Sequence, residues 1–125
     1  MDEQQLTILL ADDDPGFSHA AALALREAGF AVALAANGEE ALKQAEDLSP
    51  DLILLDERMP KKGGIEVLEE IRKKKWGKGL PVIFLTNIDN QDVINKALSL
   101  EAIDYLIKSD TPLESLVDNV RLRLS

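Results

Sequence analysis

The 125-residue sequence contains no cysteine, a single histidine and few aromatic residues. Without cysteine the chain forms no disulfide, thiolate nucleophile or cysteine-based metal site, and a single histidine excludes a site built from several imidazoles of one chain. No apolar run approaches the roughly 20 residues that a membrane helix needs, and residues 1–5 are polar and acidic, unlike a secretion signal. These absences predict a cytoplasmic protein that contacts no membrane.

Positive charge is also scarce. The 14 Lys and Arg residues stand against 23 Asp and Glu residues, which gives a net charge of −9. Binding to a phosphate backbone needs a basic face, so this composition argues against direct contact with nucleic acid. Hydrophobic residues make up 46% of the chain, which suffices for a core and excludes a disordered acidic chain. We expect one domain over residues 1–125, with no output domain in this chain.

Short apolar runs alternate with amphipathic stretches five times. Buried strands are predicted over 7–11, 30–35, 51–55, 81–85 and 103–107. The first two helices are predicted over 15–28 and 37–48. The third begins near Ile65 and frays near Trp76, the fourth follows a cap at Asp89 or Asn90, and the fifth runs from Pro112 to the C-terminus. Such strand–helix units form a parallel sheet with helices on both faces. The prediction is an α/β, flavodoxin-like doubly wound (βα)5 fold with the strand order 2-1-3-4-5.

Several helix ends carry recognisable signals. Asp14 followed by Pro15 is typical of the start of a helix, and Gly29 is typical of a helix end. The sequence from Thr111 to Glu114 has the T-x-x-E pattern of a capping box, with Pro at the expected first helical position. We therefore predict a capping box at the start of the last helix.

Polar side chains stand at the carboxyl ends of four of the five predicted strands. They are Asp12, Asp13 and Asp14 after the first strand, Asp56 after the third, Thr86 at the end of the fourth, and Lys108 after the fifth. In an open α/β sheet, ligands bind at these ends beside the switch in strand order, where the first and third strands are neighbours. We therefore expect these side chains to meet in one site at the carboxyl ends of the strands, which we call the mouth. Asp14 is the exception, because we interpret it as the helix cap.

Three carboxylates at one mouth repel each other, and a hard divalent cation relieves that repulsion. Mg²⁺ fits best, because it uses one or two carboxylates and keeps waters that a phosphate can replace. An ammonium and a hydroxyl beside it would hold phosphoryl oxygens. A carboxylate can itself act as the nucleophile and form an aspartyl-phosphate, and Asp56 is the most central of the three.

The segments ILLADDDP, DLILLDERMP, PVIFLT and DYLIKS resemble the receiver domain of two-component response regulators, in order and over nearly the whole chain. The resemblance implies that Asp56 accepts a phosphoryl group from a phosphohistidine on a sensor histidine kinase or phosphotransfer protein. It also implies a Mg²⁺ site formed by Asp13 directly, Asp12 largely through water, Asp56 itself and the backbone carbonyl of Arg58.

The resemblance further implies that Thr86 and Lys108 bind the phosphoryl oxygens. Tyr105 would be an aromatic switch that turns inward as Thr86 moves toward the phosphoryl group. The face built from the fourth helix, fifth strand and fifth helix would then change its protein partner, which the sequence does not name. Such a domain is not an enzyme on an external substrate, although it assists its own phosphorylation and dephosphorylation.

Three positions depart from the family's pattern. Ser109 replaces the Pro that usually follows the Lys, often after a cis bond; a non-Pro cis bond costs roughly 3 kcal/mol, so the loop is either strained or trans with another shape. Asn87 replaces a small residue after the Thr, where it would narrow the site or add a hydrogen bond. Arg58 is placed to extend over the mouth and slow attack by water.

Three rival functions remain open. A phosphorylation-independent binding module of the same fold is favoured by Asn87 and Ser109. A flavin or nucleotide carrier is disfavoured because three Asp residues would repel a phosphate. A phosphatase or mutase with an Asp nucleophile usually has a general acid two residues later, and Arg58 cannot serve as one.

Other features have simpler interpretations. His19 is predicted to be a surface residue, with a kinase-docking contact as the alternative. The basic residues Lys61, Lys62, 72–75 and Lys78 are predicted to form a solvated face, with an acidic partner as the alternative. Trp76 is expected to pack far from the mouth.

Overall fold

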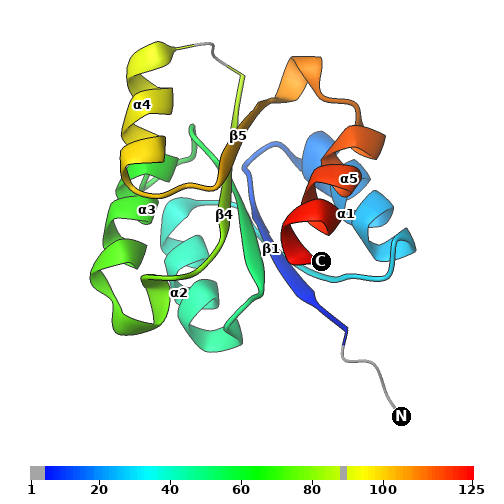
Figure 1. Ribbon diagram of the computed structural model, residues 1–125, viewed down its shortest axis with the longest axis horizontal. Helices are drawn as coiled ribbons and strands as arrows, with labels where there is room; N and C mark the ends of the chain where they lie inside the picture. Colours follow the sequence, from blue (N-terminus) through cyan, green and yellow to red (C-terminus); the bar gives the residue numbers. More distant parts are fainter. Residues whose placement is uncertain (1–4, 88–89) are drawn as a thin grey trace.

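The computed structural model describes residues 5–87 and 90–125, and these residues form one parallel sheet flanked by helices (Figure 1). The strands are β1 (Thr7–Ala11), β2 (Ala31–Ala35), β3 (Leu52–Asp56), β4 (Val82–Thr86) and β5 (Asp104–Ile107). They lie in the order β2-β1-β3-β4-β5, and every neighbouring pair is parallel. The predicted flavodoxin-like doubly wound fold is therefore confirmed.

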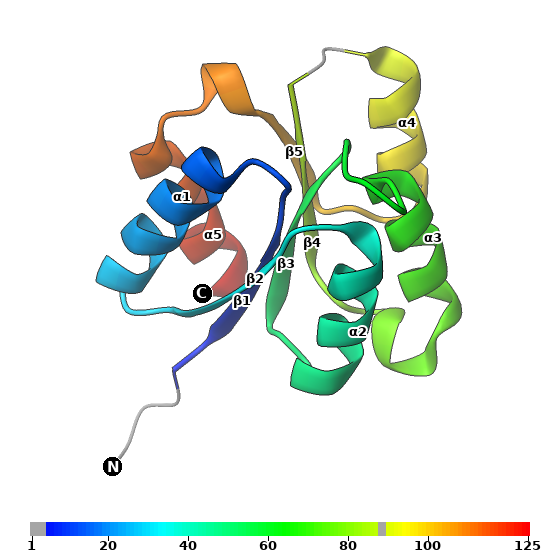
Figure 2. The ribbon, with the colours of Figure 1, turned by 180° about the vertical axis from the view of Figure 1, so that it is seen from behind.

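Helices cover both faces of this sheet (Figures 1 and 2). Helices α1 (Pro15–Glu27) and α5 (Leu113–Leu124) cover one face, and α2 (Gly38–Leu48), α3 (Gly64–Lys73) and α4 (Gln91–Ser99) cover the other. Alternate side chains of each central strand point to opposite faces, so Leu9 and Phe84 pack toward α2–α4, while Leu10 and Ile83 pack toward α1 and α5. The unbroken apolar runs of the sequence thus fill two cores.

The predicted strand boundaries are correct to within one residue. The shift matters for Asp56, which is the last residue of β3 and not, as expected, the residue after the strand. Thr86 is the last residue of β4, at the end of its strand as predicted. Their side chains are therefore held by the sheet itself. Both are almost completely buried, at 5% and 1% exposure.

The start of α1 matches the prediction. The Asp14 carboxylate accepts hydrogen bonds from the backbone N–H groups of Gly16 (3.0 Å) and Phe17 (3.3 Å). Gly29, with φ +103°, directly follows the C-cap of α1. Asn90 caps α4 through Asp92 and Val93, whereas the alternative cap, Asp89, lies outside the described residues.

The predicted capping box at Thr111 is wrong. The Thr111 hydroxyl donates to the carbonyl of Ile107 at 2.9 Å, and α5 begins at Leu113 with Pro112 as its N-cap. The physical reason is the short 3-10 turn Lys108–Asp110, which directly follows β5 and brings the Ile107 carbonyl within reach of the hydroxyl. Within the described ranges, no helix has the length and apolarity needed to span a bilayer.

Candidate functional site

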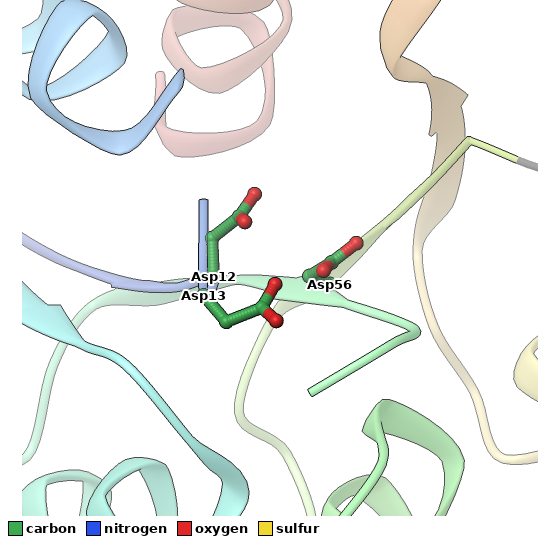
Figure 3. Close-up of side chains that lie close together, drawn as sticks. All are labelled: Asp12, Asp13 and Asp56. Carbon is green, nitrogen blue, oxygen red and sulfur yellow. The ribbon is translucent and has the colours of Figure 1, made fainter. Parts of the chain in front are cut away.

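Three carboxylates meet at the carboxyl end of the sheet, as the sequence predicts (Figure 3). The register that pairs Ala11 with Leu55 places the next residues, Asp12 and Asp56, side by side, and Asp13 follows directly. One oxygen of each carboxylate lies within 4.8 Å of the corresponding oxygens of the other two. Asp12 is 3% exposed whereas Asp13 is exposed, so solvent reaches the cluster at Asp13.

Lys108 extends into this cluster from the end of β5. Its Nζ lies 2.6 Å from Oδ2 of Asp12 and 3.5 Å from Oδ1 of Asp56. The side chain is only 7% exposed, so these ion pairs are poorly screened by water. The described backbone contains no cis peptide bond, so the bond from Lys108 to Ser109 is trans. The absence of Pro after the lysine therefore does not keep its ammonium out of the site.

The environment of Asp56 disfavours its charged form. Burial is the largest cause and the nearby charge of Asp12 the next, and together they raise the pKa of the Asp56 carboxyl from 3.8 to about 7 although Lys108 acts in the opposite direction. A carboxylate with such a pKa binds a proton near neutrality unless another cation takes the proton's place. The site therefore favours an additional positive charge.

The arrangement fits a hard divalent cation. Mg²⁺ binds six oxygens at 2.0–2.1 Å in octahedral geometry, so neighbouring ligand oxygens are about 3 Å apart and opposite ones about 4 Å apart. The three carboxylate oxygens lie within 4.8 Å of one another, so they would hold the ion by closing around it or in part through bridging waters. Asp12, Asp13 and Asp56 supply the oxygen ligands that this ion prefers. The part played by the Arg58 carbonyl stays a prediction.

The Arg58 side chain is largely exposed, and its Nε lies 3.9 Å from the carboxylate of its neighbour Glu57. That it extends over the site and slows attack by water stays a prediction. The backbone N–H of Glu57 donates to the carbonyl of Leu85 at 2.9 Å, which continues the pairing of β3 with β4. The loop after Asp56 is thus anchored by its backbone, while the Arg58 side chain points into solvent.

Thr86 and Tyr105 lie where the sequence places them, on β4 and β5. Thr86 is buried at the end of β4, and Asn87 after it is exposed. Tyr105 is half-buried and packs against the apolar layer beneath α2–α4. The structure thus gives both residues positions compatible with the predicted switch, which itself stays a prediction.

Two residues at the site escaped the sequence analysis. The first is Gly64, where a side chain would collide with the carbonyl oxygen of Asp56. The backbone N–H of Gly64 donates to the carbonyl of Glu57 at 2.9 Å. Glycine therefore allows α3 to begin this close to Asp56. Phe17 lies with its ring centre 4.6 Å from Nζ of Lys108. Helical periodicity assigned Phe17 to the apolar face of α1, and no local pattern signals a contact with a lysine 91 residues later in the chain.

The remaining predicted features lie on the surface. His19 is exposed and borders a hollow of about 340 Å³ that also includes Asp12 and Asp13, so it lies nearer the mouth than expected. Trp76 is 37% exposed and lies in the turn between α3 and β4. This turn is on the side of the amino ends of the strands, opposite the carboxylates. The lysines at 73–75 and 78 are exposed, as expected for a solvated face.

Arg72 is an exception within that basic run. Its guanidinium donates to the carbonyls of Gly77 (2.6 Å), Leu80 (2.8 Å), Leu100 (2.7 Å) and Glu101 (3.0 Å). Burial lowers the pKa of this group from its usual value, opposed by the charge of Glu101. Arg72 therefore ties α3 to the loop before β5 rather than contributing to a solvated face.

Comparisons with known proteins agree with this geometry. The family model described as "Response regulator receiver domain" matches residues 8–121. The DNA-binding response regulator MtrA of Mycolicibacterium smegmatis is 38% identical over 99% of this chain and 53% of its own length. The transcriptional regulatory protein ZraR of Klebsiella oxytoca is 41% identical over the whole chain and 27% of its own length. The chain thus spans about half or less of these curated relatives.

Solved structures show the same fold. A CheY-like response regulator receiver domain protein from Methanospirillum hungatei superposes with a TM-score of 0.90, at 26% identity, over 97% of this chain and 94% of that one. The chemotaxis response regulator CheY4 of Vibrio cholerae superposes with a TM-score of 0.87, also at 26% identity, over 94% of this chain and 98% of that one.

Proposed function

Because the chain belongs to the family of response regulator receiver domains, we propose that Asp56 is its phosphoacceptor in two-component signalling. The observation that carries this proposal is the buried Asp56 carboxylate, flanked by Asp12, Asp13 and the Lys108 ammonium. Charged side chains are rarely buried, because removing a charge from water is costly. Here two carboxylates are buried together with a lysine, an arrangement that clusters at functional sites.

The reaction follows from these groups. An Asp56 carboxylate oxygen attacks the phosphorus of a phosphohistidine, the P–N bond breaks, and the imidazole leaves with the electron pair while an O–P bond forms. Lys108 and Thr86 would hold the phosphoryl oxygens, as expected from their places at the ends of β5 and β4. Asp12, Asp13, Asp56 and the Arg58 carbonyl would hold Mg²⁺, which supplies positive charge to the phosphoryl oxygens.

The phosphorylated chain would signal by a change of protein partner. A phosphoryl group would add charge near Thr86, and Tyr105, half-buried on the neighbouring strand, would respond by turning inward. The face formed by α4, β5 and α5 would then bind a different partner. In this proposal the chain acts on no external substrate and only assists its own phosphorylation and dephosphorylation.

The proposed partners and location follow from the same family. The phospho-donor would be a sensor histidine kinase or a phosphotransfer protein in the cytoplasm. The net charge of −9 supports a receiver domain that itself contacts neither nucleic acid nor membrane, although the relatives named above include DNA-binding regulators. We treat residues 1–125 as a single receiver domain.

The test is the intact mass of the protein after incubation with acetyl phosphate, with and without Mg²⁺. We expect one added phosphoryl group that depends on Mg²⁺ and is absent in Asp56→Asn. Asp14→Asn is the matched control, because Asn also caps a helix and this residue lies beside the cluster without belonging to it. Uptake by Asp56→Asn would contradict the assignment.

A phosphorylation-independent binding module is the alternative, and exposed Asn87 after Thr86 is the observation that favours it. Wild-type protein that neither gains mass nor forms a complex with beryllofluoride, a mimic of the phosphoryl group, would support this alternative. Complex formation without added mass would instead indicate a short-lived phosphoryl group.

A further inference from the structure

The ammonium of Lys108 has an aromatic ring as well as carboxylates around it. Nζ lies 4.6 Å from the centre of the Phe17 ring, within the roughly 6 Å over which a cation and an aromatic face attract each other. The carboxylates of Asp12 and Asp56 lie at 2.6 Å and 3.5 Å from the same nitrogen. Because the lysine side chain is 7% exposed, little water weakens the contact with the ring.

The backbone around Lys108 gives the side chain little support. The residue begins the 3-10 turn Lys108–Asp110, none of whose residues is buried, and both Ser109 and Asp110 are exposed. The backbone N–H of Thr111 donates to the Lys108 carbonyl at 3.3 Å and closes this turn. The position of the ammonium therefore depends on what its own side chain contacts.

The contacts from Phe17 to Lys108 belong to a closed chain of interactions. Oδ1 of Asp12 accepts a hydrogen bond from the Asp14 backbone at 2.9 Å, and the Asp14 carboxylate caps α1 through the Phe17 N–H at 3.3 Å. The Phe17 ring contacts Lys108, whose Nζ returns to Oδ2 of Asp12. The same acidic residue thus helps to place both the lysine and the helical turn that carries the ring.

We propose that Phe17 is the positioning residue for Lys108. Its ring holds the ammonium at the mouth while the nitrogen moves from Asp12 to an oxygen of the incoming phosphoryl group. A carboxylate holds an ammonium through directional hydrogen bonds that must break during this movement. The ring face attracts through its quadrupole and offers no lone pair that competes with the phosphoryl oxygen.

The shape of the surface supports a positioning role. A hollow of about 420 Å³ lies beside the ring, bordered by Phe17, Ala20 and residues 108–113. A smaller or non-aromatic side chain at position 17 would open the ammonium to water in this hollow. The lysine would then have more orientations available, and fewer of them would place Nζ at the reacting oxygen.

The first experiment tests the contact without any phosphorylation. In protein labelled with ¹³C-lysine, ring currents should shift the ε-CH₂ protons of Lys108 upfield, and loss of that signal in Lys108→Arg assigns it. We expect the shift to persist in Phe17→Tyr, which keeps the aromatic face, and to vanish in Phe17→Leu, which keeps only apolar volume. An unchanged Lys108 signal in Phe17→Leu would overturn the proposal.

The second experiment tests the consequence, which rests on the proposed function. With acetyl phosphate and Mg²⁺, we expect Phe17→Leu to be labelled about five- to tenfold more slowly than wild type, and Phe17→Tyr to recover most of that rate. Leu23→Ala is the control, because Leu23 is 60% exposed on the same helix. Denaturation curves confirm that each variant is folded.

The two possible failures are distinguishable. Labelled wild type with an equally fast Phe17→Leu variant would refute the positioning role and leave the phosphoacceptor assignment intact. A wild type that neither gains mass nor binds beryllofluoride would contradict the proposed function, and the lysine spectrum would still decide whether Phe17 contacts and positions Lys108.

Discussion

Replacing Asp56 by Asn should stabilise the fold when no divalent cation is present. The Asp56 side chain is 95% buried, next to the charge of Asp12, and only Lys108 at 3.5 Å favours its ionised form. Asn has nearly the same shape and carries no charge. The substitution therefore removes an electrostatic penalty and leaves the packing of β3 almost unchanged.

The size of this penalty follows from the pKa of Asp56. Burial, and then the charge of Asp12, raise the pKa from 3.8 to about 7. One pKa unit corresponds to 1.36 kcal/mol, so the ionised carboxylate destabilises the folded state by up to about 4 kcal/mol. We expect Asp56→Asn to raise the free energy of unfolding by at least about 1 kcal/mol near pH 8, since relaxation and water entry reduce the full value.

The pH dependence gives the prediction its sign. Between pH 3.8 and about 7 the folded chain holds a proton on Asp56 that the unfolded chain releases, so stability falls as the pH rises. This contribution to stability is fully present below the lower value and lost above the upper one. The advantage of Asp56→Asn over wild type should therefore be largest near pH 8 and shrink toward about pH 5.

The assay is urea unfolding in EDTA, followed by circular dichroism at several pH values. Asp118→Asn is the control, because its carboxylate is 70% exposed and should give no pH-dependent gain. Mg²⁺ should stabilise wild type more than Asp56→Asn near pH 8. A variant no more stable than wild type at that pH, or a difference that does not change with pH, would refute the electrostatic account of this site.

Three further substitutions test other parts of the structure by urea unfolding. Gly64→Ala should lower the free energy of unfolding by at least about 2 kcal/mol, because the new Cβ would collide with the Asp56 carbonyl. Gly79→Ala is the control, since a Cβ there meets no atom within 4 Å, and equal losses in the two variants would contradict the close approach at Gly64. Arg72→Lys should cost about 2 kcal/mol, because an ammonium cannot reproduce the forked contacts to four carbonyls, and a loss below about 0.5 kcal/mol would contradict that role. Asp14→Ala should cost about 1 kcal/mol and Asp14→Asn almost nothing; equal losses would argue against capping.

Local signals predicted most of the fold because they act between near neighbours in the chain. The apolar runs at β1, β3 and β4 are unbroken because both faces of these strands are buried, and that burial requires helices on both sides. Asp14 and Gly29 are correctly placed at the ends of α1 for the same local reasons. The capping box at Thr111 failed because the turn that follows β5 offers its hydroxyl a nearer acceptor, the carbonyl of Ile107.

The sequence by itself determined the strand ends, and with them the meeting of Asp12, Asp13 and Asp56, because parallel strands end at one edge of a sheet. Only the tertiary structure decided what surrounds those carboxylates: Phe17 beneath Lys108, and Gly64 against the Asp56 carbonyl. It also decided that Arg72 joins α3 to the loop before β5. Each of these contacts depends on where a helix packs relative to the sheet or its loops. Residue type and local periodicity do not determine the distance between segments that are far apart in the chain.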